Sequence, residues 1–332
     1  MHEALKRGEI PYLKSFESDH TMAEAVKIFK VELDENDENY ACCKKLRPHC
    51  ESLLKQMTSE FSLDQTTFLE RFAPFLDLNT VIDWLHTLAW ICQNSCYFFF
   101  AKIVANLAYD LLGNLDDTST DAVTLQWKVL NVSGVVYNSL GEYSQAKDLH
   151  EKALMISRKI FGEDHGSVVV AASYNNFATV HFCLKEYNQA KELNEKAMMI
   201  YRKIFGEDDA TVATICNNLA SVYYNLKEYN QAKELQEKAL MIRKKIFGAD
   251  HADVATSYNN LASVYKRLKE YNQAKELHEK ALIIRKKIFG EDHADVATSY
   301  NNLALVYYNL KEYNSSQRTS RKSTDDSQKD FW

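Results

Sequence analysis

Pairs of adjacent asparagines are the most regular polar feature of this sequence. An asparagine side chain competes with the helical backbone for hydrogen bonds, so two of them in the middle of a helical pattern need a physical reason. A primary amide can donate to a carbonyl oxygen and accept from an N–H group, which are the two groups of a peptide backbone. A row of such amides could bind a peptide, and the competing interpretation is a solvated polar face. The pairs are Asn175–Asn176, Asn217–Asn218, Asn259–Asn260 and Asn301–Asn302.

Aromatic and cationic residues follow the first asparagine of each pair by two helical turns. Aromatic rings can hold apolar ligand residues, and the two adjacent cations add one local positive site. The two most similar stretches, 210–251 and 252–293, differ at 8 of 42 positions, including 224/266 and 225/267. We therefore predict a binding surface that favours a ligand with an acidic residue near an aromatic one. The candidate contact residues are Asn175, Asn217, Asn259, Asn301, Phe182, Tyr224, Lys266, Arg267 and Tyr308.

No arrangement of residues in the sequence predicts catalysis. The phosphate-binding pattern GxxxxGK[ST], the dinucleotide pattern GxGxxG and the metalloprotease pattern HExxH are all missing. His165, His251 and His293 recur about once per 42 residues, too far apart to share a metal ion, so we assign them to connectors. Cys92 and Cys96 lie one helical turn apart and are interpreted as packing residues. We expect neither an enzyme nor a bound cofactor or metal.

The candidate residues belong to a repeated element. The dipeptide Glu-Tyr recurs with its tyrosines 44, 42, 42 and 42 residues apart. A fixed period of this length is typical of a solenoid, in which each unit covers the apolar face of its neighbour. The extra two residues fall in the stretch 165–176, where a helix is expected to begin. The tyrosines that mark the period are Tyr143, Tyr187, Tyr229, Tyr271 and Tyr313.

Each unit contains two helical patterns joined by a short turn. Apolar residues recur at spacings of three and four residues, which places them on one face of a helix. Gly290 suits the left-handed position that follows a helix C-terminus. Ala262, Ala274 and Ala281 are small enough to allow the two helices to pack closely. In the unit 252–293 the first stripe is Val254, Tyr258, Leu261, Tyr265 and Leu268, and the second is Ala274, Leu277, Ala281, Ile284 and Ile288.

This pattern resembles the tetratricopeptide repeat, and its period resembles the 42-residue subclass found in kinesin light chains. The resemblance covers about 125–315. One departure is that the large residue usual in the middle of the second helix is polar here, at His150, Asn194, Gln236 and His278. The residues that carry the resemblance are Tyr258, Leu261, Ala262, Tyr265, Ala274 and Ala281, repeated at Cys216, Leu219, Ala220, Tyr223, Ala232 and Ala239.

The resemblance implies an all-α fold: a right-handed superhelix of stacked antiparallel helix pairs, preceded by an irregular helical region. It also implies that the first asparagine of each pair lies on the concave face, whereas the second has a structural hydrogen-bonding role. The implied function is a non-catalytic scaffold or adaptor that binds a peptide segment of another protein. Kinesin light chains bind the motor heavy chain through heptad repeats, and residues 1–124 contain no sustained heptad run. The sequence therefore does not support association with a motor protein. The alternatives are a sensor arm related to the arrays of nucleotide-binding signalling proteins and a structural spacer.

We divide the chain into three parts. Residues 1–124 are expected to form helices, including 23–33, 41–61, 65–76, 80–93 and 96–114, as degenerate hairpins packed on the first regular repeat. Residues 125–315 are expected to form about four complete repeats and a partial fifth. Residues 316–332 are polar and without apolar period, so a disordered tail is expected.

Composition excludes several classes of protein. The net charge of −6 gives no general attraction to nucleic acid or to anionic membranes. The most apolar stretch, 87–101, is shorter than the roughly 20 residues of a membrane-spanning helix. The N-terminus lacks the apolar segment of a signal peptide, and the seven cysteines follow no disulfide framework. We therefore expect a cytoplasmic protein with a protein or peptide partner.

Overall fold

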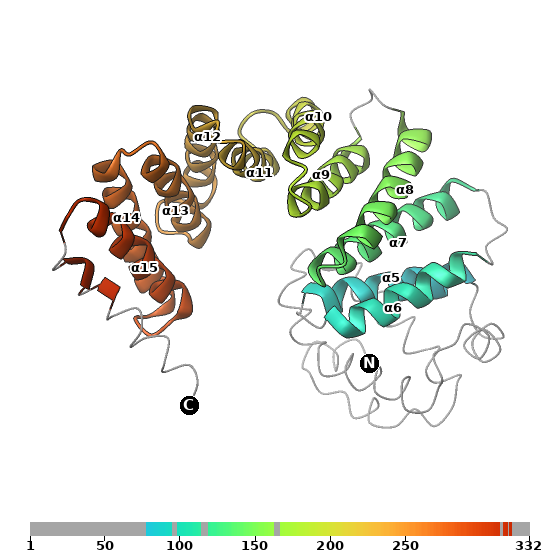
Figure 1. Cartoon of the computed structure of the whole chain (residues 1–332). Helices are drawn as coiled ribbons and strands as arrows, with labels where there is room; N and C mark the ends of the chain where they lie inside the picture. The colour runs from blue at the N-terminus through green and yellow to red at the C-terminus, as the bar shows by residue number, and fades with distance from the viewer. Residues whose placement is uncertain are drawn as a thin grey trace. The chain divides into compact units, whose positions relative to one another are not determined.

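The computed structural model describes residues 78–94, 98–113, 119–162, 167–312, 315–317 and 319–320. These residues are mostly helical and contain no strand (Figure 1). The helices expected at 23–33, 41–61 and 65–76 and the connector residue His165 lie outside this part of the chain. The described helices are α5 (Leu78–Asn94), α6 (Phe98–Leu112), α7 (Thr120–Ser139), α8 (Tyr143–Phe161), α9 (Val168–Cys183), α10 (Tyr187–Phe205), α11 (Ala210–Asn225), α12 (Tyr229–Phe247), α13 (Ala252–Arg267), α14 (Tyr271–Phe289) and α15 (Ala294–Asn309).

The helices belong to two compact units. The first unit contains α5–α8, and the second contains α9–α15. Within each unit, helices pair in chain order, α5 with α6 and α7 with α8, then α9 with α10, α11 with α12 and α13 with α14. Each pair also packs on the first helix of the next pair in its unit. The predicted all-α architecture of stacked helix pairs is confirmed.

The turn inside each pair has a fixed backbone conformation. Lys269 adopts a left-handed conformation with φ of 63°, and the same value recurs within two degrees at the equivalent lysines. The turn is closed by the Glu270 N–H, which donates to the Tyr265 carbonyl oxygen at 2.9 Å. The first unit has Gly141 at this place, with φ of 78°, a conformation that glycine adopts more readily than the lysines do. Gly290, predicted to end the second helix, has φ of 84°, so that prediction is confirmed.

Neighbouring pairs share apolar clusters in the second unit. Leu240 of α12 packs with Val254 and Tyr258 of α13 and with Ile284 of α14. All four side chains are buried. Ala262 and Ala274 form a second cluster with a residue of the next repeat, Val306. Adjacent pairs therefore cover most of the two apolar stripes predicted from the sequence, as a solenoid requires, whereas Ile288 at the end of the second stripe is 42% exposed.

The first unit uses the same contacts with less regular residues. Lys102 of α6 lies over the ring of Tyr137, 5.0 Å from its centroid, just as Lys233 lies over Tyr265 at 4.7 Å. The Tyr137 hydroxyl donates to Asn106 Oδ1 at 2.8 Å. The helix expected at 80–93 is α5 and the helix expected at 96–114 is α6. This agreement supports the interpretation of α5 and α6 as a degenerate hairpin.

The chain after α15 differs from expectation. Residues 315–317 and 319–320 are helical, and the Ser316 hydroxyl donates to the Ala304 carbonyl oxygen at 3.0 Å. The described residues of the stretch expected to be disordered, 316–317 and 319–320, are therefore helical. These residues are ordered because a polar segment can still pack on the open face of the preceding helix. Residues 321–332 lie outside the described part.

A buried polar residue occupies the middle of each second helix. Asn194, Gln236 and His278 are at most 3% exposed, and so is His150 in the first unit. Neither ring nitrogen of His278 has a hydrogen-bond partner within the described residues. Burial, and then the charges of Lys266 and Arg285, lower the pKa of His278 from 6.5 to about 4. The polar residues that depart from the usual pattern therefore lie inside the stack.

The buried imidazole predicts a loss of stability in acid. The unfolded chain protonates His278 near pH 6.5, whereas the folded chain resists protonation until about pH 4. Stability contributed by the neutral ring is therefore complete above pH 6.5 and declines as the pH falls to 4, by about 3 kcal/mol in total. His278→Gln, which copies the residue at Gln236, should reduce the dependence of the unfolding free energy on pH over this range. Urea titrations followed by circular dichroism measure it, and an unchanged slope would contradict the assignment.

Candidate peptide-binding surface

The asparagine pairs connect consecutive repeats through a ladder of hydrogen bonds. In each step the second asparagine of one repeat donates its Nδ2 to the Oδ1 of the first asparagine in the preceding repeat. The steps are Asn218 to Asn175 at 3.0 Å, Asn260 to Asn217 at 2.8 Å and Asn302 to Asn259 at 2.8 Å. We call the face of α9, α11, α13 and α15 that carries Asn175, Asn217, Asn259 and Asn301 the asparagine face.

The ladder changes what the first asparagines can offer to a ligand. The Oδ1 atoms of Asn175, Asn217 and Asn259 already accept from the next repeat. The Nδ2 of Asn175 donates to Asn176 Oδ1 at 3.3 Å. The Nδ2 groups of Asn217 and Asn259 have no partner within the described residues. The Oδ1 of Asn217 accepts two hydrogen bonds and is fully used, whereas the Oδ1 atoms of Asn175 and Asn259 each accept one within the described residues and can accept a second.

Buried Gln236 joins the ladder from the second helix. Its Nε2 donates to Asn217 Oδ1 at 3.1 Å, so this oxygen accepts from both α12 and α13. Gln236 Oε1 has no hydrogen-bond partner among the described residues. This contact was not predicted, although the polar residue in place of a large one was a visible signal. It fixes the orientation of the Asn217 amide.

Exposure of the asparagine face increases at its last helix. Asn217 and Asn259 are half-buried, whereas Asn301 is exposed. Leu305 and Tyr308, which follow Asn301 on the same face of α15, are 52% and 62% exposed. In the preceding repeats the next first helix covers part of this face. The asparagine face is therefore partly covered where the ladder bonds join it to the next first helix, and it is exposed on α15.

The structure brings two of the predicted aromatic and cationic residues together. Arg267 Nε donates to the Tyr224 hydroxyl at 2.7 Å, and the guanidinium carbon lies 5.4 Å from the centre of that ring. Lys266 is half-buried, and its pKa is lowered by burial first and by the charge of Arg267 second. Within the described residues neither cation has an ion pair with a carboxylate. The pair therefore forms a positive site whose only bonded partner is a neutral phenol.

The remaining aromatic candidates are separate. Phe182 packs edge-on against Tyr187 of its own repeat with ring centres 5.6 Å apart, and Tyr224 packs in the same way against Tyr229. Both rings are half-buried by these contacts. Tyr308, on α15, is much more exposed. The predicted aromatics are thus equivalent in sequence but present different areas to a ligand.

The connector histidines cap helices. His251 Nδ1 accepts from the Asp253 N–H at 3.2 Å, and its ring stacks on Phe247 at 4.6 Å. His293 has the same arrangement with Asp295 and Phe289. The described residues hold no group of three His, Cys, Asp or Glu side chains suited to a metal ion. None of the described helices is long and apolar enough to span a membrane.

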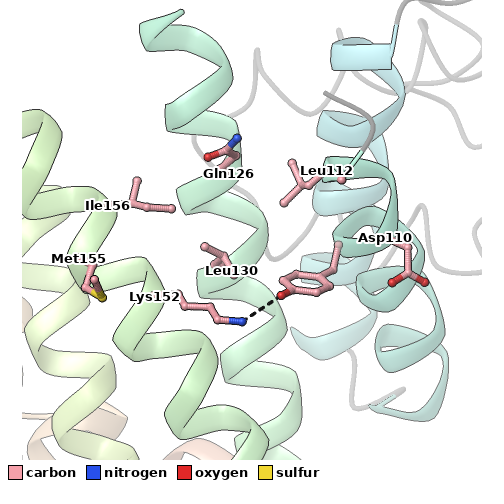
Figure 2. Close-up of a pocket in the computed structure, with 9 residues that line it drawn as sticks. Asp110, Leu112, Gln126, Leu130, Lys152, Met155 and Ile156 are labelled. Atoms are coloured by element: carbon pink, nitrogen blue, oxygen red, sulfur yellow. Dashed lines mark hydrogen bonds between the residues drawn. The ribbon is translucent and has the colours of Figure 1, made fainter. Parts of the chain in front are cut away.

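The first unit contains a separate hollow that sequence reasoning did not detect. Its volume is about 520 Å³, and its walls come from α6, α7 and α8. The Lys152 ammonium donates to the Tyr109 hydroxyl at 3.1 Å on one side of it (Figure 2). The other lining residues are Asp110, Leu112, Gly113, Gln126, Leu130, Met155 and Ile156.

The sequence profile described as the tetratricopeptide repeat matches four overlapping segments. They are 128–203, 169–245, 211–282 and 253–329, which together span more than half of the chain. The chain belongs to the tetratricopeptide repeat family. A comparison with curated protein sequences gives no match.

Solved tetratricopeptide structures share this fold at low sequence identity. BtubC (BKLC) from P. vanneervenii has a TM-score of 0.59 and 22% identity, covering 68% of this chain and 89% of its own. A putative kinesin light chain from Podosopora anserina with nearly identical repeats has a TM-score of 0.55 and 21% identity, covering 61% and 96%. A Rap protein complexed with competence and sporulation factor has a TM-score of 0.52 and 14% identity, covering 99% and 97%. These neighbours show that the chain has the fold of stacked tetratricopeptide repeats.

Two substitutions at Asn259 separate its structural role from its surface role. Asn259→Ala removes the acceptor of the Asn302 bond and should lower the unfolding free energy by about 1 kcal/mol. Asn259→Asp keeps an oxygen acceptor and should retain most of the stability. Urea denaturation of both variants checks this order. Equal stability of the alanine and aspartate variants would show that the ladder bond contributes nothing.

Proposed function

We propose that this tetratricopeptide repeat protein is a non-catalytic scaffold that binds a peptide segment of another protein on its asparagine face. The observation that carries the proposal is that Asn217 and Asn259 each have a bonded Oδ1 and an unpaired Nδ2 within the described residues. Their Oδ1 atoms are held by the ladder, so their unpaired Nδ2 groups are fixed in orientation. Fixed donors bind at a lower entropic cost than freely rotating ones.

The Nδ2 groups of Asn217 and Asn259 can donate hydrogen bonds to the carbonyl oxygens of a peptide backbone. Packed helices lie about 8–10 Å apart, and three residues of a polyproline-type chain span about 9 Å. An extended peptide that crosses the first helices therefore offers one carbonyl to each asparagine at about every third residue. The backbone supplies general affinity in this arrangement, and side chains supply selectivity.

Selectivity should come from Tyr224, Lys266 and Arg267. The two cations repel each other, which is one cause of the lowered pKa of Lys266. An acidic ligand residue would relieve this repulsion, and an aromatic or apolar neighbour could pack on the Tyr224 ring. The proposal therefore specifies a ligand in which an acidic residue lies near an aromatic one. A fold neighbour, the Rap protein, is known in complex with competence and sporulation factor, which is consistent with a binding role for this fold.

The proposal is tested with a phage-displayed library of random dodecapeptides selected on the full chain. Enriched peptides should contain an acidic residue close to an aromatic one. Asn259→Asp retains the ladder acceptor but replaces the amide donors with a repelling oxygen, so it should weaken the enriched peptides by about tenfold or more.

A matched variant controls for the added charge. Asn230→Asp places the same charge on an exposed position of α12, outside the asparagine face, and should bind the selected peptides normally. Peptides that bind Asn259→Asp as well as the original chain would refute the use of this face. Selection of peptides without an acidic residue would refute the role of Lys266 and Arg267.

A further inference from the structure

The hollow in the first unit lies at a place that is fully packed in the second unit. We call the packed contact between α12, α13 and α14, formed by Leu240, Val254, Tyr258 and Ile284, the regular corner. The contacts of Lys102 and Asn106 with Tyr137 match those of Lys233 and Glu237 with Tyr265. With the helices aligned on these contacts, the core residues Leu240, Val254, Tyr258 and Ile284 correspond to Tyr109, Gln126, Leu130 and Ile156. All four residues of the second set line the hollow.

Two differences open this corner. First, α6 ends at Leu112, which corresponds to Arg243, whereas α12 continues to Phe247. Second, Leu130 replaces the tyrosine of the regular corner, so the ring that occupies this position in the second unit is missing. Tyr109, in the place of buried Leu240, is 37% exposed and reaches Lys152 instead. The space is thus produced by a helix one turn shorter and by a smaller side chain.

The hollow has mostly apolar walls and one ammonium group at its edge. Leu112, Leu130 and Ile156 supply apolar walls. At the edge, Lys152 donates to a neutral phenol, and this ammonium has two further N–H groups. In Figure 2 the Asp110 carboxylate points away from the ammonium, on the far side of α6. Among the described residues the ammonium forms no ion pair, and the acidic groups nearby are Asp110, which lines the hollow, and Asp148, one turn before Lys152 on α8.

We propose that this hollow binds a small organic carboxylate with an aromatic or branched apolar body. The carboxylate accepts hydrogen bonds from Lys152 and from the Tyr109 hydroxyl, whose oxygen and the ammonium lie 3.1 Å apart. The apolar body lies against Leu130 and Ile156, in the space that Tyr258 fills in the regular corner. A volume of about 520 Å³ suits such a molecule, since small-molecule pockets in proteins are typically about 300–1,000 Å³.

Hydrocinnamate and its neutral amide, hydrocinnamide, test the proposal on the full chain by isothermal titration calorimetry. The carboxylate should bind about tenfold or more tightly than the amide, because it alone makes charge-assisted hydrogen bonds. Lys152→Gln should remove this preference. Lys152 is exposed, so this variant is expected to fold. The matched control, Lys280→Gln, changes the exposed lysine at the same place in the regular corner and should leave the preference unchanged.

Leu130→Tyr tests the cavity itself, because it restores the residue of the regular corner. It should abolish binding of both compounds while the circular dichroism spectrum stays helical. Equal binding of hydrocinnamate and hydrocinnamide to the original chain would overturn the proposal. So would a preference for the carboxylate that persists in Lys152→Gln. No binding at all would show that the hollow is closed in solution and would also overturn it.

Discussion

A single pair of these helices cannot cover its own apolar residues. In the second unit the first helix of each pair has buried residues on two sides, one set facing its partner and one facing the neighbouring pairs. Tyr258 illustrates this, since it packs with Leu240 from the preceding repeat and with Ile284 from its own. Burial of apolar area therefore accumulates only when pairs stack. The fixed period, the turn lysines and the small alanines all serve this one requirement.

Apolar packing does not by itself set the register between repeats, and the polar ladder supplies that information. Asn217 accepts from Gln236 and from Asn260, so one oxygen joins three helices. Half-buried hydrogen bonds of this kind contribute modestly to stability but penalise a shifted register, because a shift would leave amides unpaired. The same bonds hold the remaining N–H groups of the first asparagines in one orientation. A structural constraint thus prepares the surface on which we propose that a peptide binds.

The sequence predicted the repeated elements well because each of them depends on local rules. The stripe through Val254 and Tyr258 follows helical spacing, and Gly290 follows the conformational preference of a helix end. The asparagine row was also predicted, but the direction of its hydrogen bonds was not. That direction depends on the distance between adjacent first helices, which no single repeat encodes. The helical residues 315–317 were missed because their contact with α15 is likewise tertiary.

The hollow in the first unit was not predicted because it results from an irregularity. Leu130 looks like an ordinary core residue, and it is indeed only 5% exposed. Only the alignment of α6 with α12 through their tyrosine contacts reveals that a ring and a helical turn are missing beside it. Irregular residues within a repeat family are therefore informative when each is compared with the residue that occupies the same place in a regular repeat.

The asparagine ladder couples adjacent repeats through hydrogen bonds. A double-mutant cycle with Asn217→Ala and Asn260→Ala measures this coupling directly from the unfolding free energies of the two single variants and the double variant. The cycle isolates the Asn217–Asn260 bond from the bond that Gln236 makes to the same oxygen. A coupling energy of about 1 kcal/mol is predicted. Additive effects, with a coupling energy of zero within error, would contradict the account.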